Sequence, residues 1–386
     1  MSDGPYCRKG KPIRVLMTAD TVGGIWTYAV ELARALGRHG VEVALATMGA
    51  PLSTQQRQEV AAVPGLALYE SHYRLEWMED PWEDVYRAGD WLLELEEELA
   101  PDVIHLNSYV HGALPWRAPV MVVGHSCVLS WWQAVKGEPA PPSWDRYRRE
   151  VQAGLQAADL VLAPTRSMLA ALDEYYGPLE TTGVVPNGIA RSEENSSPQP
   201  KERMVLTAGR VWDEAKNVSA LEAVAPRLHW PVYVAGEDHH PDGGRACPQN
   251  VNYLGYLPRK SLRQWYRRAA IYALPARYEP FGLSALEAAT EGCALVLGDI
   301  PSLREVWQDA ALYVPPNDNA ALQRALSGLM ANPSRRAMLA ARAQARARYF
   351  SPERMATGYL VAYCRLITGE GLPTVKVLGR SVPQRA

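Results

Sequence analysis

Short apolar runs alternate with segments of helical periodicity along most of the chain. Residues 13–18 form a mostly apolar run that predicts a buried strand, and a glycine pair follows it. In the segment 28–38 apolar residues recur every three to four positions, which predicts a helix, and residues 41–45 predict the next strand. A strand, a helix and a second strand within about 30 residues are typical of a parallel, doubly wound sheet.

The same alternation continues to about residue 190 and resumes after a polar break. Before the break we predict strands at 103–106, 120–123, 160–162 and 184–185 and helices at 84–99 and 146–157. Residues 191–202 lack apolar periodicity and predict a linker. Beyond it we predict strands at 205–206, 232–234, 251–254, 271–274, 295–297 and 312–314 and helices at 218–225, 262–269, 280–291, 320–330 and 334–349. The fold class is therefore α/β, with two Rossmann-like domains facing across a cleft, at 1–190 and 191–351, and a last helix within 352–386 packing back onto the first domain.

The composition is that of an ordinary globular protein. The 386 residues are 47% hydrophobic and 21% charged, with a net charge of -2, which argues against a nucleic-acid coat. No run approaches the roughly 18 apolar residues of a membrane span, and residues 1–11 lack the apolar core of a secretory signal. Five scattered cysteines without a CxxC pair predict reduced thiols and a cytoplasmic location.

The charge is unevenly divided between the two halves. Residues 1–199 carry 16 basic and 26 acidic side chains, a balance of -10, whereas residues 200–386 carry 24 and 16, a balance of +8. Either this asymmetry belongs to solvated faces, or the second half receives an anionic ligand. The pattern leaves both readings open.

The segment 278–287 is the most informative for chemistry, because it follows a predicted strand and opens a predicted helix. Pro280 suits the first helical position, which places Glu279 at the helix entrance. Free backbone amides at such an N-terminus bind phosphate. Here we expect them to belong to Gly282, Leu283 and Ser284.

Two glutamates and two cations complete this pattern. Glu287 follows Glu279 by eight residues, about two turns, where its carboxylate would suit sugar hydroxyls. Taken alone, the two glutamates are better explained as a helix-dipole partner and a surface residue. Arg210, however, ends the first strand of the second domain and Lys216 follows it, a pair that suits a diphosphate.

These segments resemble the nucleotide-sugar glycosyltransferases of family four, which have the GT-B fold. The likeness spans residues 14–361, and its matching segments are 23–24, 185–189, 208–217 and 279–288. It implies that the second domain holds a nucleotide diphosphate sugar. It also implies that the enzyme is a retaining hexosyltransferase that moves the sugar to an acceptor hydroxyl.

The resemblance also implies roles for individual residues. Arg210 and Lys216 would hold the diphosphate and Glu279 would lie against the donor sugar. His125 would face that sugar from the first domain, and Glu287 would bind the ribose. We expect further donor contacts from Gly23, Gly24, Asn187, Gly209, Phe281, Gly282, Leu283 and Ser284. The family has no agreed enzymic nucleophile, and none is assigned here.

Fixed cations and helix amides would stabilise the leaving diphosphate, so we expect neither a metal ion nor a cofactor beyond the sugar nucleotide. The chain has no Asp-x-Asp triplet. His239 and His240 lie between two aspartates, but their spacing favours a solvated loop over a metal site. Two departures from the family pattern bear on the donor: Trp26 stands where a small residue is common, and Gly236-Glu237-Asp238 replaces Gly-x-Gly.

Aromatic residues of the first domain predict where the acceptor binds. Trp26, Trp131 and Trp132 would stack on sugar faces, the last two from a proline-rich loop at 126–147; the alternative is a small apolar cluster under that loop. The acidic balance of this domain predicts a soluble acceptor, most simply a saccharide, with no membrane association and no nucleic acid. An arginine-rich helix at 335–348 is the counter-indication.

Other activities fit less well. A catalytically idle sugar-nucleotide-binding protein on the same fold, or a related glycosyl phosphorylase or synthase, stays open as an alternative. The turn after the first strand lacks G-x-G-x-x-G, which disfavours a dehydrogenase, and the chain lacks the G-x-S-x-G of serine hydrolases.

Overall fold

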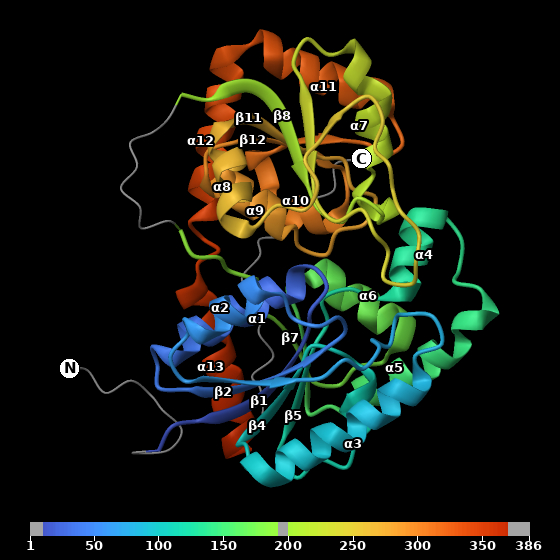
Figure 1. The fold of residues 1–386 in the computed structure, drawn as a ribbon, viewed down its shortest axis with the longest axis vertical. Helices are drawn as coiled ribbons and strands as arrows, with labels where there is room; N and C mark the ends of the chain where they lie inside the picture. The colour runs from blue at the N-terminus through green and yellow to red at the C-terminus, as the bar shows by residue number, and fades with distance from the viewer. Residues whose placement is uncertain (1–10, 192–199, 370–386) are drawn as a thin grey trace, which may run out of the picture.

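The computed structural model describes residues 11–191 and 200–369, which form two α/β domains stacked one on the other (Figure 1). In the first domain all pairings join parallel strands, in the order β3-β2-β1-β4-β5-β6-β7. The strands are β1 Arg14–Asp20, β2 Glu42–Met48, β3 Leu66–Glu70, β4 Val103–Leu106, β5 Val120–Val123, β6 Leu160–Ala163 and β7 Thr182–Val184. The helices are α1 Gly24–Gly37, α2 Thr54–Ala61, α3 Trp82–Leu99, η1 Val110–Ala113, α4 Val128–Lys136, η2 Pro142–Trp144, α5 Asp145–Ala157 and α6 Arg166–Tyr176.

The second domain repeats this plan with a six-stranded parallel sheet in the order β10-β9-β8-β11-β12-β13. Its strands are β8 Glu202–Ala208, β9 Val232–Ala235, β10 Asn252–Tyr253, β11 Ala269–Leu274, β12 Ala294–Gly298 and β13 Leu312–Val314. Its helices are η3 Glu214–Lys216, α7 Val218–Val224, η4 Ala225–Arg227, α8 Arg259–Arg268, α9 Leu283–Thr290, α10 Pro301–Trp307, η5 Gln308–Ala310, α11 Asn319–Ala331 and α12 Pro333–Ala347. In both sheets the strand order reverses beside the first strand, where ligands of such folds bind.

The last helix, α13 (Pro352–Thr368), returns to the first domain and packs against α1. Tyr359 and Tyr363 are fully buried there, and the Tyr363 hydroxyl lies 2.7 Å from Nδ1 of His105 in β4. In Figure 1 this red helix runs down beside α1. The parts of the predicted linker at 192–199 and of the predicted last segment at 370–386 lie outside the described residues.

The predicted fold class is confirmed, whereas several local predictions are wrong. Residues 126–147 are not a loop, because they contain α4 and η2. The helix predicted from residue 280 begins at Leu283, so Pro280 is not in its first turn. Gly282 is its N-cap, with a φ of 89° that glycine adopts readily.

Continuous burial explains why short apolar runs become central strands. All six residues of β11 and all four of β4 are buried, as expected of parallel strands covered by helices on both faces. No helix among the described residues is both long enough and apolar enough to cross a membrane. Cys364 is disulfide-bonded, so the expectation of reduced thiols throughout is wrong for this residue, while Cys127, Cys247 and Cys293 are free.

Candidate active site

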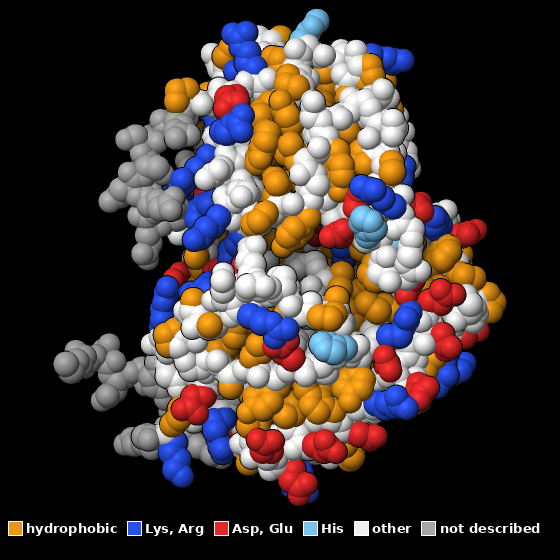
Figure 2. Space-filling view, in the orientation of Figure 1, with side chains coloured by type: hydrophobic (Ala, Val, Ile, Leu, Met, Phe, Trp, Pro, Cys, Tyr) orange, Lys and Arg blue, Asp and Glu red, His pale blue; other side chains and the backbone are white. Residues whose placement is uncertain are grey.

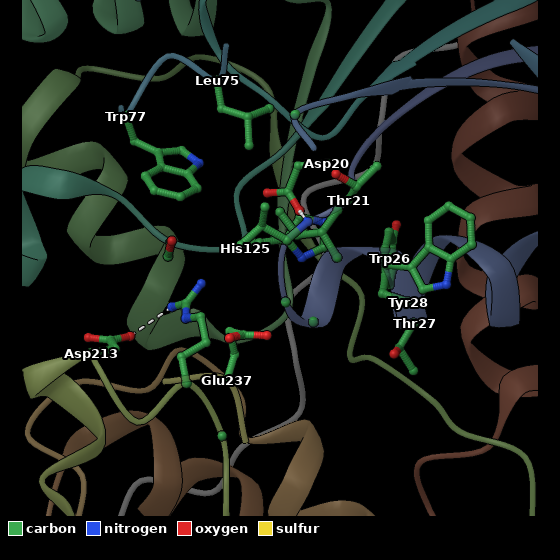
Figure 3. A pocket seen from close by; sticks show the side chains of 18 of the residues that line it. Asp20, Thr21, Trp26, Thr27, Tyr28, Leu75, Trp77, His125, Asp213 and Glu237 are labelled. Carbon is green, nitrogen blue, oxygen red and sulfur yellow. Dashed lines mark hydrogen bonds and ion pairs between the residues drawn. The ribbon is translucent and has the colours of Figure 1, made fainter. Parts of the chain in front are cut away.

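A cleft of about 1100 Å³ lies between the two domains, at the carboxyl ends of both parallel sheets. The turns after β1, β4 and β5 line it from the first domain, and those after β8, β9 and β11 line it from the second. Apolar side chains gather on both sides of the cleft, next to charged side chains and histidines (Figure 2). Residues from both domains converge on it (Figure 3).

Glu279 and Lys216 form an ion pair on the side of the cleft that the second domain supplies. Lys216 Nζ lies 2.6 Å from Glu279 Oε2, and both side chains are largely buried. The other carboxylate oxygen accepts the amide of Gly282 at 2.9 Å. The expectation that the Gly282 amide is free for phosphate is therefore wrong, because Glu279 takes it. Glu279 also precedes α9 rather than opening it, which places Glu287 only about one turn inside the helix.

Arg210 is held by a carboxylate that the sequence reasoning missed. Its Nη2 donates to Oδ2 of Asp213 at 2.8 Å, the interaction drawn as a dashed line in Figure 3. Burial would raise the pKa of Asp213, but the charges of Arg210 and Lys216 outweigh it and the pKa lies below its ordinary value. Asp213 is therefore an anion that orients the guanidinium. Its place between two predicted cations in the sequence was the signal available.

The glycine pair after β1 closes against the second domain. A Cβ on Gly23 would lie 3.2 Å from Nη1 of Arg210, and one on Gly24 would lie 3.3 Å from Cδ1 of Leu283. Gly23 also has a φ of 87°. Glycine is needed here because the turn approaches the cation and the N-terminus of α9 closely. Trp26 does not obstruct the turn, since its side chain is buried and its Nε1 donates to Glu59.

Gly236 has a packing role that its motif did not reveal. A Cβ at this position would lie 1.6 Å from the carbonyl oxygen of Gly209, so the end of β9 can lie against the end of β8 only with glycine here. The first glycine of the expected Gly-x-Gly motif is thus present, and it allows the two strand ends to approach each other closely.

His125 follows β5 and lines the cleft as a neutral base. Its Nε2 lies 2.8 Å from Oδ1 of Asn107, and its ring meets that of Tyr28 edge to face at 4.5 Å. Burial lowers the pKa of His125 to about 3, so the imidazole is uncharged at neutral pH. It can exchange hydrogen bonds with a ligand but cannot offer a positive charge.

Glu287 lines the cleft beside a second network of charged side chains. Arg259 Nε is 3.9 Å from Glu287, and Arg259 Nη1 is 2.6 Å from Glu31 of α1. Burial raises the pKa of Glu287, although the charge of Arg259 opposes it. One arginine therefore joins this glutamate to the first domain.

The remaining predicted donor residues all line the same cleft: Gly23, Gly24, Asn187, Gly209, Phe281, Gly282, Leu283 and Ser284. Asn187 is the most informative, because its Oδ1 is buried without a hydrogen-bond partner among the described residues. The side chain of Phe281 packs against Phe350 in the core, so it offers the cleft only its backbone.

Two carboxyl groups of the first domain, the partly exposed Asp20 and the buried Glu76, were not predicted. Asp20 ends β1, and burial raises its pKa to about 7, with Arg210 opposing the shift. Glu76 accepts the amides of Tyr109 and Val110, and burial raises its pKa to about 7 as well. Both line the cleft. The position of Asp20 at a strand end was a usable signal, but nothing in the sequence marked Glu76.

The loop after β9 reaches across to the first domain. Its Asp242 pairs with Arg74 at 2.5 Å, and the His240 ring meets that of Trp212 at 4.5 Å. The side-chain atoms of Glu237, Asp238 and His239 that could bind a metal ion lie within 4.8 Å of one another. Asp238 already pairs with Arg245 at 2.8 Å, which fits a solvated loop.

Among the described residues, each Lys or Arg that lines the cleft has an acidic partner. The pairs are Arg74 with Asp242, Arg210 with Asp213, Lys216 with Glu279, and Arg259 with Glu31. Three of the four cations belong to the second domain. An anionic ligand is therefore best received there, by sharing cations that the protein already holds in place.

Two families match the chain, one in each domain. The family described as Glycosyltransferase Family 4 matches residues 22–193, and Glycosyl transferases group 1 matches residues 202–332. The D-inositol 3-phosphate glycosyltransferase of Xylanimonas cellulosilytica is 27% identical over an alignment covering 89% of this chain and 92% of the relative.

Solved structures agree. The sucrose-phosphate synthase of Thermosynechococcus elongatus matches with a TM-score of 0.76 at 18% identity, covering 93% of this chain and 100% of that one. Anabaena HepE in complex with UDP and glucose matches with a TM-score of 0.69 at 15% identity, covering 91% and 99%. The architecture is that of the GT-B glycosyltransferases. The chain is a glycosyltransferase of the family-four type, which confirms the resemblance drawn from its sequence.

Proposed function

We propose that this glycosyltransferase moves a hexosyl group from a nucleotide diphosphate sugar to a hydroxyl of a saccharide or another soluble acceptor, with retention of anomeric configuration and without a metal ion. The observation that carries the proposal is the placement of Arg210, Lys216 and Glu279 together at the carboxyl ends of β8 and β11. Two cations there suit a diphosphate, and the carboxylate suits the sugar attached to it.

The charges fit the chemistry of the transfer. Breaking the bond between the sugar and the diphosphate develops positive charge on the sugar ring and negative charge on the leaving diphosphate. Arg210 and Lys216 would stabilise the leaving group, and Glu279 would lie against the ring. His125, neutral and facing the cleft from the first domain, would contact the donor sugar, and Glu287 would bind the ribose hydroxyls.

The acceptor would enter on the side of the first domain. That side holds Asp20 and Glu76, and the one lining cation among its described residues, Arg74, is paired with Asp242. Such a surface suits a neutral or cationic saccharide. The relative from Xylanimonas is named for an inositol phosphate acceptor. We propose that the acceptor here lacks that phosphate. We also propose that Trp132 contacts the acceptor.

One screen tests the proposal. Thermal unfolding is followed with ADP, GDP and UDP and with their sugar conjugates, starting from UDP-glucose because HepE was solved with UDP and glucose. A ligand at 100 times its Kd should stabilise the fold by about 2.7 kcal/mol. The best donor is then incubated with neutral saccharides. Transfer supports the proposal, and binding without transfer or hydrolysis would support an idle sugar-nucleotide-binding protein instead. Formation of a sugar phosphate from a saccharide and inorganic phosphate, with no nucleotide present, would indicate a phosphorylase.

A further inference from the structure

Helix α4 of the first domain lies against the loop of the second domain that follows β8. The indole Nε1 of Trp131 donates to Oδ1 of Asp213 at 3.0 Å. One turn further along α4, Lys136 Nζ pairs with Glu214 at 2.8 Å. In Figure 1 the helix stands at the right-hand edge of the molecule, beside the lower part of the second domain. These contacts place α4 on the segment that connects Arg210 to Lys216.

The start of α4 contacts the loop that follows β11. The amide of Cys127 and the hydroxyl of Ser130 both donate to the hydroxyl oxygen of Tyr278, at 3.0 and 2.9 Å. Tyr278 is the residue before Glu279. One helix of the first domain therefore contacts both loops that carry the charges of the proposed donor site.

Asp213 connects α4 directly to Arg210. Asp213 is 5% exposed, and its carboxylate accepts hydrogen bonds from both domains. Oδ1 accepts Nε1 of Trp131 and the amide of Ala215, while Oδ2 accepts Nη2 of Arg210. The indole thus fixes the rotamer of the carboxylate that orients the guanidinium.

We propose that Trp131 is a positioning residue of the donor site. It holds Asp213, and through Asp213 it sets the Arg210 guanidinium for a diphosphate, so that the first domain completes a site whose cations belong to the second. This inference rests on the proposed function. It differs from the sequence expectation, in which Trp131 stacks on the acceptor.

The physical reason lies in how Asp213 shares its negative charge. With the indole in place, Oδ1 has two donors and Oδ2 is left for Arg210. Without the indole N–H, a buried carboxylate loses a donor and draws more strongly on Arg210. Arg210 then has less hydrogen-bonding capacity for an incoming diphosphate, and its orientation is less fixed.

The test is Trp131→Phe, which removes the N–H and keeps an aromatic ring. The Kd of the nucleoside diphosphate found in the screen should rise at least about threefold, as for residues in one hydrogen-bond network. The Kd of the matching nucleoside monophosphate should change less. Donor KM should rise, with acceptor KM unchanged. The matched control is Trp116→Phe in the same domain. Trp116 itself does not line the cleft, and its indole donates to the carbonyl of His111 at 2.8 Å, so the nucleotide Kd of this variant should stay at the wild-type value.

A double variant tests the positioning role of Trp131 separately from the proposed donor site. In Arg210→Ala, adding Trp131→Phe should change the diphosphate Kd no further, because the effect passes through Arg210. If Arg210→Ala weakens binding but Trp131→Phe does not, the positioning role is wrong and the donor site stands. If Arg210→Ala binds like the wild type, the donor site itself is misassigned. If Trp131→Phe instead raises the acceptor KM and leaves the diphosphate Kd unchanged, Trp131 contacts the acceptor, as expected from the sequence. Should Trp131→Phe fail to fold, Asp213→Asn tests the same link.

Discussion

Lys216 places its ammonium group 2.6 Å from the carboxylate of Glu279, joining the segments that follow β8 and β11. The two residues are 63 positions apart in the sequence. Each therefore has its counter-charge before any ligand arrives, and a diphosphate must share Lys216 with Glu279. This relationship separates the expected effects of removing the cation from those of removing the carboxylate.

Removing a cation should weaken nucleotide diphosphate binding. Arg210→Ala or Lys216→Ala deletes one charge-assisted contact, which costs on the order of 1.5–3 kcal/mol. Calorimetry should therefore show at least a tenfold rise in the Kd of the diphosphate, while circular dichroism shows a folded protein. Arg268→Ala is the matched control, because Arg268 lies in the same domain but pairs with Glu202 at the surface. Unchanged affinity in both cleft variants would refute the diphosphate site.

Removing the carboxylate charge should separate binding from turnover. Glu279→Gln keeps an oxygen that can accept the Gly282 amide but frees Lys216 from its counter-charge. Diphosphate binding should therefore hold or tighten. The kcat should fall on the order of 10²-fold, because a charge facing the developing positive sugar ring is lost. Stopped-time transfer assays at saturating donor measure this, and a wild-type kcat would remove Glu279 from the catalytic centre.

Transfer should not depend on a divalent metal. Arg210 and Lys216 supply the positive charge that a bound ion would otherwise offer to the leaving diphosphate. We expect the full rate in excess chelator and no gain on adding Mg²⁺ or Mn²⁺. Loss of activity in chelator that Mg²⁺ or Mn²⁺ restores would show that the fixed cations are insufficient.

The carboxyl group of Asp20 should make stability depend on pH. Its pKa is about 7 in the folded protein, raised mainly by burial, against an ordinary value of 3.8. Between those values the folded state binds more protons than the unfolded state. The free energy of unfolding therefore falls as pH rises through this window. Asp20→Asn removes this contribution, so it should be more stable relative to wild type at pH 8 than at pH 5.

Urea unfolding at the two pH values measures that difference. Asp90→Asn, at an exposed site on α3, should follow the wild type at both. Some pH dependence should survive in Asp20→Asn, because burial also raises the pKa of Glu76 to about 7. Identical pH dependence in Asp20→Asn and wild type would show that Asp20 ionises freely in the fold.

Local sequence signals predicted the strands and the loops in which we place the donor, but not how the domains meet. Alternating apolar runs predicted the sheets because parallel central strands are buried on both faces. Arg210, Lys216 and Glu279 could be picked out because they lie in the segments that follow β8 and β11, and Glu287 because it lies in the next helix. The misreading of α4 arose because prolines further along the segment suggested a loop. The partners of these charges come from distant elements, as with Trp131 and Asp213, and local periodicity carries no information about contacts of that kind.

The acceptor should be soluble and should lack a phosphate. Residues 1–199 balance at -10, which gives an anionic leaflet little to attract, since each basic residue near such a surface contributes about 1 kcal/mol. Inside the cleft, Arg74 is the only Lys or Arg that the described part of the first domain contributes to the lining, and Asp242 neutralises it. The basic helix α12, which would favour membrane contact, belongs to the second domain. A neutral saccharide should therefore have a higher kcat/KM than its phosphate ester.

Three measurements decide this. The ratio of kcat/KM for a sugar and its phosphate ester should favour the sugar, and Arg74→Ala should change that ratio little. Trp132→Ala should raise acceptor KM while leaving the diphosphate Kd near the wild-type value, in contrast to Trp131→Phe. Cosedimentation with anionic vesicles at about 0.15 M salt should leave the protein in solution. Preference for the phosphate ester, or strong vesicle binding that Arg335→Ala and Arg342→Ala together abolish, would instead indicate an anionic or membrane-borne acceptor.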